Sequence, residues 1–143
     1  MADINRPAPG ISYFTYEQST PAGTAIMPQK SGKLIPKLFQ PLKIRGVEFQ
    51  NRVFLSPLAQ YSTRDGIVTP WHLAHLGGIL TRGPGLTTIE ASAVLPEGRT
   101  TQEDAGIWSD AHIKPLTQIV ERKASTVPLW IAHAPTATKE VGG

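Results

Sequence analysis

Two short stretches place small, amide and hydroxyl side chains directly after apolar runs. Residues 56–61 (SPLAQY) follow the run at 53–55, and residues 90–92 (EAS) follow the run at 86–89. Ordinary turns are built mainly from Gly, Asn, Asp, Ser and Pro, so the Leu, Ala, Gln and Tyr of residues 58–61 are an unusual continuation of a buried strand. A tyrosine hydroxyl can donate to a bound ligand, and Glu90 could act as a catalytic carboxylate. No second carboxylate lies near Glu90 in the sequence, so we favour a structural hydrogen-bonding role for it.

The elements around these stretches alternate between strand and helix. A hairpin turn is expected at Arg45-Gly46. Thr69 can cap a helix that begins at Pro70 and ends at residues 83–85 (GPG), and a second helix is expected over residues 109–122. The order strand, helix, strand, helix builds a parallel sheet, whose chemistry lies beyond the carboxyl ends of its strands. Both polar stretches occupy such ends.

Apolar residues at helical spacing predict the buried face of each helix. The predicted faces consist of Trp71, Ala74, His75, Ile79 and Leu80 in the first helix, and of Ile113, Leu116, Ile119 and Val120 in the second. His72 and His75 are three residues apart and lack a third ligand, so a capping or packing role is favoured over a metal site. We expect His112 at the surface, and Trp71 and Trp108 packed beneath loops.

Composition excludes several classes of function. The chain has 143 residues, about one domain, with 40% hydrophobic and 17% charged residues, as in globular proteins. It has no cysteine, which rules out disulfides, thiol catalysis and thiolate metal sites. The net charge is +3 and its longest basic cluster is Arg122-Lys123, too small for a nucleic-acid footprint. No signal peptide or membrane span is visible, so we expect a soluble, cytoplasmic protein without a membrane partner.

Four motifs in order resemble the start of the Old Yellow Enzyme family. They read KLFQPLKIRGVEFQNRVFLSPLAQYS, DGIVTPWHLAHLGG, GLTTIEASAVLPEGR and GIWSDAHIKPL, within residues 34–121. The resemblance is to the subgroup of NADPH dehydrogenases that carry an SPM-Q-YS sequence. It implies an FMN-dependent NAD(P)H oxidoreductase, an ene-reductase that takes electrons from NADPH or NADH and reduces activated C=C bonds in small enone-type substrates.

The resemblance also implies the residues of the site. The family's flavin contacts fall on Ser56, Pro57, Leu58, Ala59 and Ala91, and its substrate-pocket tyrosine falls on Tyr61. A flat isoalloxazine ring needs apolar packing and backbone hydrogen bonds, which small residues and a proline allow. Tyr61 could polarise the carbonyl of an enone. Ala59 stands where many relatives have a cysteine that tunes the flavin, so that tuning is not expected here.

The resemblance breaks after Glu121. The family continues into a third strand that ends in a flavin-contacting glutamine motif, whereas here RKAS follows at once, as if a segment of about twenty residues were missing. We therefore place IAHA around His133 in a downstream loop and assign His133 no site. The family's substrate-anchoring histidine pair has no counterpart in the chain.

The sequence thus predicts an α/β fold, the N-terminal portion of a (β/α)8 TIM barrel with about two βα units and an N-terminal hairpin. Its expected parts are an extended Pro- and Gly-rich arm (1–33), a partial flavin oxidoreductase domain (34–121) and a divergent or spliced loop segment (122–143). An uncovered sheet edge would favour self-association, and the isolated chain is expected to be poorly stable and to lose FMN. The alternative is a catalytically inactive remnant or interaction module that cannot bind FMN by itself.

Overall fold

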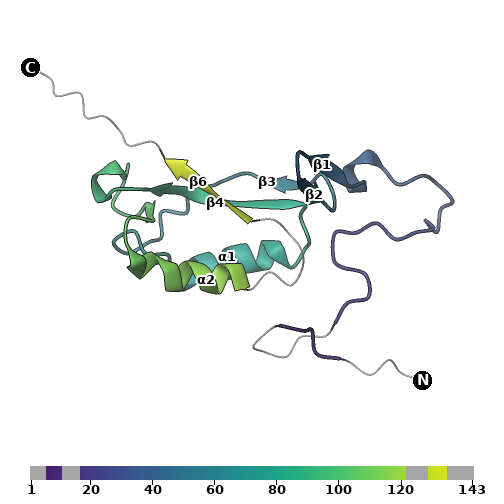
Figure 1. Cartoon of the computed structure of the whole chain (residues 1–143), viewed down its shortest axis with the longest axis horizontal. Coiled ribbons are helices and arrows are strands. Elements are labelled where there is room, and N and C mark those ends of the chain that lie inside the picture. Colours follow the sequence, from purple (N-terminus) through teal and green to yellow (C-terminus); the bar gives the residue numbers. More distant parts are fainter. Residues whose placement is uncertain (1–5, 11–16, 122–128, 135–143) are drawn as a thin grey trace, which may run out of the picture.

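Two helices cover one face of a small parallel sheet in this computed structural model, which describes residues 6–10, 17–121 and 129–134 (Figure 1). The elements of the sheet and its cover are β3 (Phe54–Leu55), α1 (Pro70–Leu80), β4 (Leu86–Ala93), β5 (Ala105–Gly106), α2 (Ile113–Glu121) and β6 (Leu129–Ala134). A separate antiparallel hairpin of β1 (Leu42–Ile44) and β2 (Val47–Phe49) precedes them. Short 3-10 turns span Lys37–Phe39, Pro96–Gly98 and Asp110–His112.

Strand β4 is the centre of the sheet. Its Thr87 pairs with Leu55 of β3 on one edge and with Leu129 of β6 on the other, and every pairing in this sheet is parallel. β5 shares the edge that β3 occupies but pairs farther along, at Ser92 and Ala93. The order β3, β4, β6 with α1 and α2 as crossovers is that of consecutive strands in a βα barrel. The predicted partial barrel is therefore confirmed, and β6 adds a third parallel strand to the two expected.

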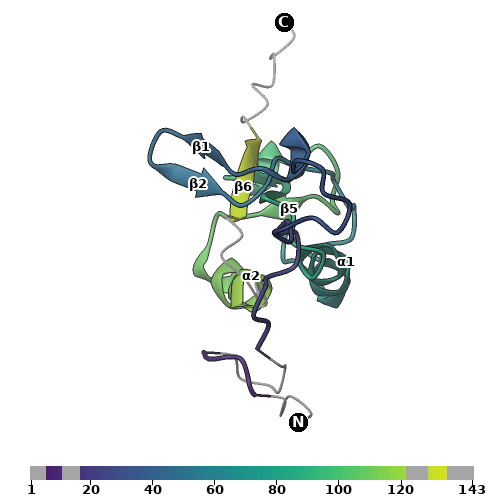
Figure 2. The same ribbon diagram turned by 90° about the vertical axis from the view of Figure 1, so that its right-hand side faces the viewer.

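The core lies between the sheet and the two helices. Its buried members are Val68, Leu76, Ile89, Ala105 and Ile119, with Leu55, Leu73 and Leu116 packed against them. Figure 2 views the same two helices from the end, side by side beneath the sheet. This core supplies the apolar burial that stabilises α1 and α2, since short helices are marginal on their own.

The predicted buried face of α1 was partly wrong. His72, Leu76 and Leu80 are the buried residues of the helix, whereas Trp71 is 53% exposed and Ala74 is also exposed. The face is rotated toward His72 because the polar groups of its ring are paired inside the protein. Trp71 therefore does not pack beneath a loop as expected.

Predictions for α2 were mixed. Leu116 and Ile119 face the core, but Ile113 is 61% exposed and Val120 is also exposed. His112 is only 3% exposed, so its expected surface position was wrong. Trp108 lies as expected within loops: its ring meets His112 edge-on at 4.7 Å, and Arg99 lies 5.3 Å from its centre.

At the other end of the sheet, Asn51 joins the N-terminal arm to the barrel strands. Its side-chain nitrogen donates to the carbonyls of Gly23 (2.9 Å) and Gly83 (2.8 Å), and its Oδ1 accepts the N–H of Val53 (2.9 Å). Gly83 has φ +68° and an added Cβ would lie 1.9 Å from the Ala22 oxygen, so only glycine fits there. The arm thus packs against the turn that follows α1.

The C-terminal stretch differs from expectation. Residues 129–134 form strand β6, and His133 pairs with Ser92 of β4 instead of lying in a loop. That expectation was wrong because the open edge of β4 accepts a strand here. The neighbouring residues 122–128 and 135–143, which include the proposed junction, lie outside the described residues. Within the described ranges no helix has the length and apolarity to cross a membrane.

Asn51→Ala tests the link between arm and barrel. It removes three hydrogen bonds at a residue that is 1% exposed, so the Gly23 carbonyl and the Val53 N–H lose this partner, while the Gly83 carbonyl keeps the Gln50 side chain. We expect the free energy of unfolding to fall by about 3 kcal/mol, measured by urea denaturation. Gln29→Ala, which removes one exposed bond to the Ile26 carbonyl, is the control and should change it by less than about 0.5 kcal/mol. Equal losses in the two variants would contradict the assignment.

Candidate functional site

The two polar stretches of the sequence meet at the carboxyl ends of β3 and β4. Ser56, Pro57, Leu58 and Ala59 continue from β3 and are all exposed. Ala91, near the end of β4, is exposed as well. We call these five residues the strip; their side chains are small or apolar and each is exposed, and Ser56 and Leu58 also line the small pocket beside α1.

A β-bulge sets the direction of the side chains at the end of β4. Ile89 pairs with Ile131, and Ser92 pairs with His133. Between these two pairs β4 therefore has one residue more than β6. At this point of the strand Ile89 and Glu90 are buried and Ala91 is exposed. Bulges of this kind commonly re-aim side chains beside functional sites. The sequence predicted a strand over residues 86–89, followed by the polar stretch 90–92; the strand in fact runs to Ala93.

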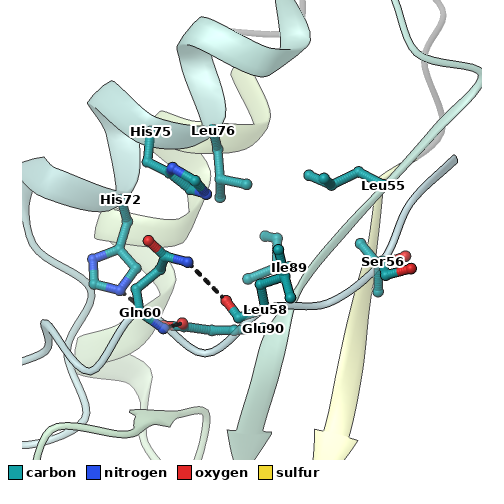
Figure 3. Close-up of a pocket in the computed structure, with 10 residues that line it drawn as sticks. Leu55, Ser56, Leu58, Gln60, His72, His75, Leu76, Ile89 and Glu90 are labelled. Atoms are coloured by element: carbon teal, nitrogen blue, oxygen red, sulfur yellow. Dashed lines mark hydrogen bonds and ion pairs between the residues drawn. The ribbon is translucent and has the colours of Figure 1, made fainter.

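Glu90 connects the strip to helix α1 (Figure 3). Its Oε1 lies 2.8 Å from Nε2 of His72, and its Oε2 accepts the backbone N–H of Gln60. The side chains of His72 and Glu90 are 1% and 3% exposed. A buried carboxylate needs such partners, because removing a charge from water is costly unless it is hydrogen-bonded. The structural role predicted for Glu90 is confirmed.

His72 is held in one orientation by the start of α1. Its Nδ1 accepts the backbone N–H of Thr69 at 3.0 Å, which is the N-cap of the helix. The proton of a neutral ring is then on Nε2, the atom that faces Glu90. The hydroxyl of Thr69 donates to the Ser62 carbonyl (2.9 Å), so the cap also fastens the loop that follows the strip. The predicted capping role of His72 is confirmed.

Gln60 forms hydrogen bonds that hold the backbone of residues 58–62 in place. Its side-chain nitrogen donates to the Leu58 carbonyl (2.9 Å) and its Oε1 accepts from Trp71 Nε1 (3.1 Å). Its own carbonyl accepts from the Ser62 hydroxyl (2.8 Å). Tyr61 follows with φ +49° and is 59% exposed. A bulky residue in this left-handed region is uncommon; Arg45, in the turn between β1 and β2, also has a positive φ of 52°.

The pocket behind the strip is not itself a ligand site. It lies between α1 and the strand ends, where His75, Leu76, Leu55 and Ile89 point inward (Figure 3). Its open volume of about 10 Å³ is room for one water molecule at most. A ring-sized ligand therefore does not fit inside this pocket.

Sequence reasoning missed Gln60 and the partnership of His72 with Glu90. The sequence does carry a signal for the capping role of His72. Thr69 and His72 have the spacing of a capping box, with an imidazole at the position usually held by Glu or Gln. Ser109 and His112 repeat that spacing at the start of the second helix. The contact across to β4 joins residues eighteen positions apart, which no local pattern encodes.

These features define a class of protein: a βα-barrel portion whose strand ends carry exposed small and apolar side chains. A family profile described as NADH:flavin oxidoreductase / NADH oxidase matches residues 37–141. An NADH:flavin oxidoreductase of Gibberella zeae is 47% identical over 156 residues, covering 97% of the chain and 36% of that protein. An NADPH dehydrogenase of Bacillus subtilis is 43% identical over 103 residues, covering 68% of the chain and 30% of its own length.

Solved structures agree. Morphinone reductase in complex with tetrahydroNAD superposes with a TM-score of 0.62 at 27% identity, over 69% of this chain and 27% of that one. The old yellow enzyme of Trypanosoma cruzi gives a TM-score of 0.60 at 27% identity, over 68% and 26%. The chain belongs to the NADH:flavin oxidoreductase / NADH oxidase family, as its resemblance to Old Yellow Enzymes indicated. It spans about a third of the length of the curated relatives it matches.

The left-handed backbone at Tyr61 can be tested by three substitutions at this exposed position. We expect Tyr61→Asn to be the most stable, Tyr61→Ala intermediate and Tyr61→Val the least, with about 1 kcal/mol between Asn and Val. Asn adopts positive φ readily and a β-branched residue does not, while little packing is lost in any variant. Thermal unfolding monitored by circular dichroism gives the ranking. A Val variant as stable as the Asn variant would contradict the conformation.

Proposed function

We propose that this chain forms one wall of the flavin site of an FMN-dependent NAD(P)H oxidoreductase of the Old Yellow Enzyme type. The observation that carries the proposal is the strip: five small or apolar residues exposed together at the carboxyl ends of β3 and β4. Family membership and the names of the relatives, which include NADPH dehydrogenases and a flavin oxidoreductase, support it.

The residues present fit a flavin ring. Ala59 and Ala91 leave its edge room, Pro57 and Leu58 offer apolar contact, and the strip is not covered by any side chain in the described part of the chain. Ser56, Pro57, Leu58, Ala59 and Ala91 would hold the ring. When bound, FMN would supply hydride transfer between a reduced nicotinamide and the substrate.

Tyr61 is the proposed substrate-binding residue. Its side chain is 59% exposed and follows the strip, so its hydroxyl can reach a ligand above the ring position. Donation of that hydroxyl to the carbonyl oxygen of an enone would withdraw electrons from the conjugated C=C bond and favour hydride addition to it. NADPH or NADH is the reductant, the substrate is a small enone-type molecule, and the cytoplasm is the proposed compartment.

A second candidate is a catalytically inactive remnant or interaction module. One observation favours it: the alignment with the Gibberella zeae relative covers 156 residues, more than the 143 of this chain, so that protein has residues without a counterpart here. A segment missing at Glu121 would account for this. FMN binding and turnover by the chain decide between the two candidates.

FMN binding can be located by nuclear magnetic resonance of the isotopically labelled chain. We expect weak binding, because one wall is present, with the largest amide shifts at Ser56, Leu58, Ala59 and Ala91. Ala91→Phe should weaken binding at least about tenfold, since the added ring occupies the cofactor's place. Ala74→Phe, the same change at an exposed position of α1, is the control.

The outcome separates the candidates. Shifts confined to the strip and lost only in the Ala91 variant support the flavin wall. Shifts scattered over the surface, or none at millimolar FMN, would favour the inactive remnant. Adenosine monophosphate, which has a phosphate and no flavin ring, should leave the strip unchanged.

Turnover tests the role of Tyr61. NADPH oxidation is followed with added FMN and cyclohexenone as the activated alkene. Tyr61→Phe should lower the rate roughly 100-fold, because it removes the hydroxyl and keeps the ring. Turnover independent of this hydroxyl would remove Tyr61 from the mechanism. Absence of turnover at every protein concentration would show that the isolated chain is not an active oxidoreductase.

A further inference from the structure

We propose that Glu90 is a positioning residue of the site: its carboxylate fixes the peptide between Ala59 and Gln60 and turns the Ala59 carbonyl to the ligand side of the strip. The identity of the ligand rests on the function proposed above. The orientation of the peptide rests on contacts within the chain and can be tested without any ligand.

The first step of the argument is that a buried carboxylate must be hydrogen-bonded to be stable. Glu90 is 5% exposed, and its two oxygens are directed at different partners, Nε2 of His72 and the backbone N–H of Gln60. Both are N–H donors, and hydrogen bonds to a carboxylate are about twice as strong as neutral ones. Loss of either donor would leave a carboxylate oxygen buried and unpaired, so the Gln60 N–H cannot turn away at low cost.

The second step is the planarity of the peptide bond. In a trans peptide the C=O and N–H vectors are antiparallel, so holding the Gln60 N–H toward buried Glu90 directs the Ala59 C=O away from it. Ala59 is exposed. The carbonyls on either side are occupied, that of Leu58 by the Gln60 side chain and that of Gln60 by the Ser62 hydroxyl.

The Ala59 carbonyl, in contrast, has no hydrogen-bond partner anywhere in the described ranges. It is therefore free to accept a hydrogen bond from a ring N–H of a planar ligand on the strip. A directed backbone acceptor of this kind fixes the orientation of a ligand whose other contacts are apolar.

The third step concerns Tyr61. Its φ of +49° follows a residue tied at its N–H by Glu90 and at its carbonyl by Ser62. Strained backbone persists only where the surroundings over-determine it. Release of the Gln60 N–H would let residues 59–61 relax, so Glu90 also maintains the position of the proposed substrate-binding tyrosine.

His72 supports Glu90 from the other side. It has two separable tasks, because Nδ1 caps Thr69 and Nε2 donates to Glu90. His72→Gln retains a side chain able to accept the Thr69 N–H, as glutamine does at this position of a capping box, but it lacks the ring that reaches Glu90. This variant separates stability of the helix start from positioning of the strip.

The test uses Glu90→Gln in the labelled full chain, with Asp104→Asn as the matched control. Asp104 likewise accepts backbone N–H groups, those of Thr100 (2.8 Å) and Thr101 (3.1 Å), but in another loop. In Glu90→Gln we expect amide exchange of Gln60 to accelerate at least about tenfold, and the amide and Cα shifts of Ala59 and Tyr61 to move. His72→Gln should produce a smaller change at the same residues, and Asp104→Asn should leave them unchanged.

A second readout is the FMN titration. Glu90→Gln should weaken binding at least about fivefold and abolish the FMN-induced shift of the Ala59 carbonyl carbon, while circular dichroism confirms retained structure. If the wild-type chain binds no FMN, the proposed function fails and the exchange data still decide the role of Glu90. Unchanged Gln60 exchange and Tyr61 shifts in Glu90→Gln would overturn the positioning role in either case.

Discussion

A single buried carboxylate holds together the parts of this protein that matter for its site. Glu90 sits on β4, receives a hydrogen bond from the start of α1 through His72, and receives another from the backbone after β3 through Gln60. Because a charge in this position must be satisfied, three chain segments are brought into one arrangement. The strip and Tyr61 take their geometry from it.

At the opposite end of the sheet a neutral side chain, that of Asn51, has the role that Glu90 has at the site. Asn51, 1% exposed, joins the arm, the start of β3 and the turn after α1 through its amide. Between these two polar anchors lies an apolar core made by α1, α2 and β4. This division is that of barrel proteins, in which the ends of the strands that face the site carry chemistry and the other ends carry stability.

Sequence reasoning was most successful where the signal is local. Hairpin β1–β2, the cap at Thr69 and the order of strands and helices follow from short-range patterns, and the partial barrel follows from that order. It failed where burial depends on partners distant in sequence. His112 was placed at the surface, although its Nδ1 is taken by the cap at Ser109 and its ring packs on Trp108. His133 was placed in a loop, although the free edge of β4 accepts it.

The sequence by itself determined the strand-end location of the two polar stretches, because this depends on local patterns. Its resemblance to Old Yellow Enzymes supplied the family and the candidate residues 56–59, 61 and 91, because the motifs match in order. Only the tertiary structure decided which side each residue faces. Glu90 is buried and Ala91 exposed at the register shift between β4 and β6, and the left-handed turn at Tyr61 follows a peptide tied to Glu90. The first involves pairing with β6, about forty positions farther along the chain, and the second a hydrogen bond between residues thirty positions apart; no local pattern encodes either.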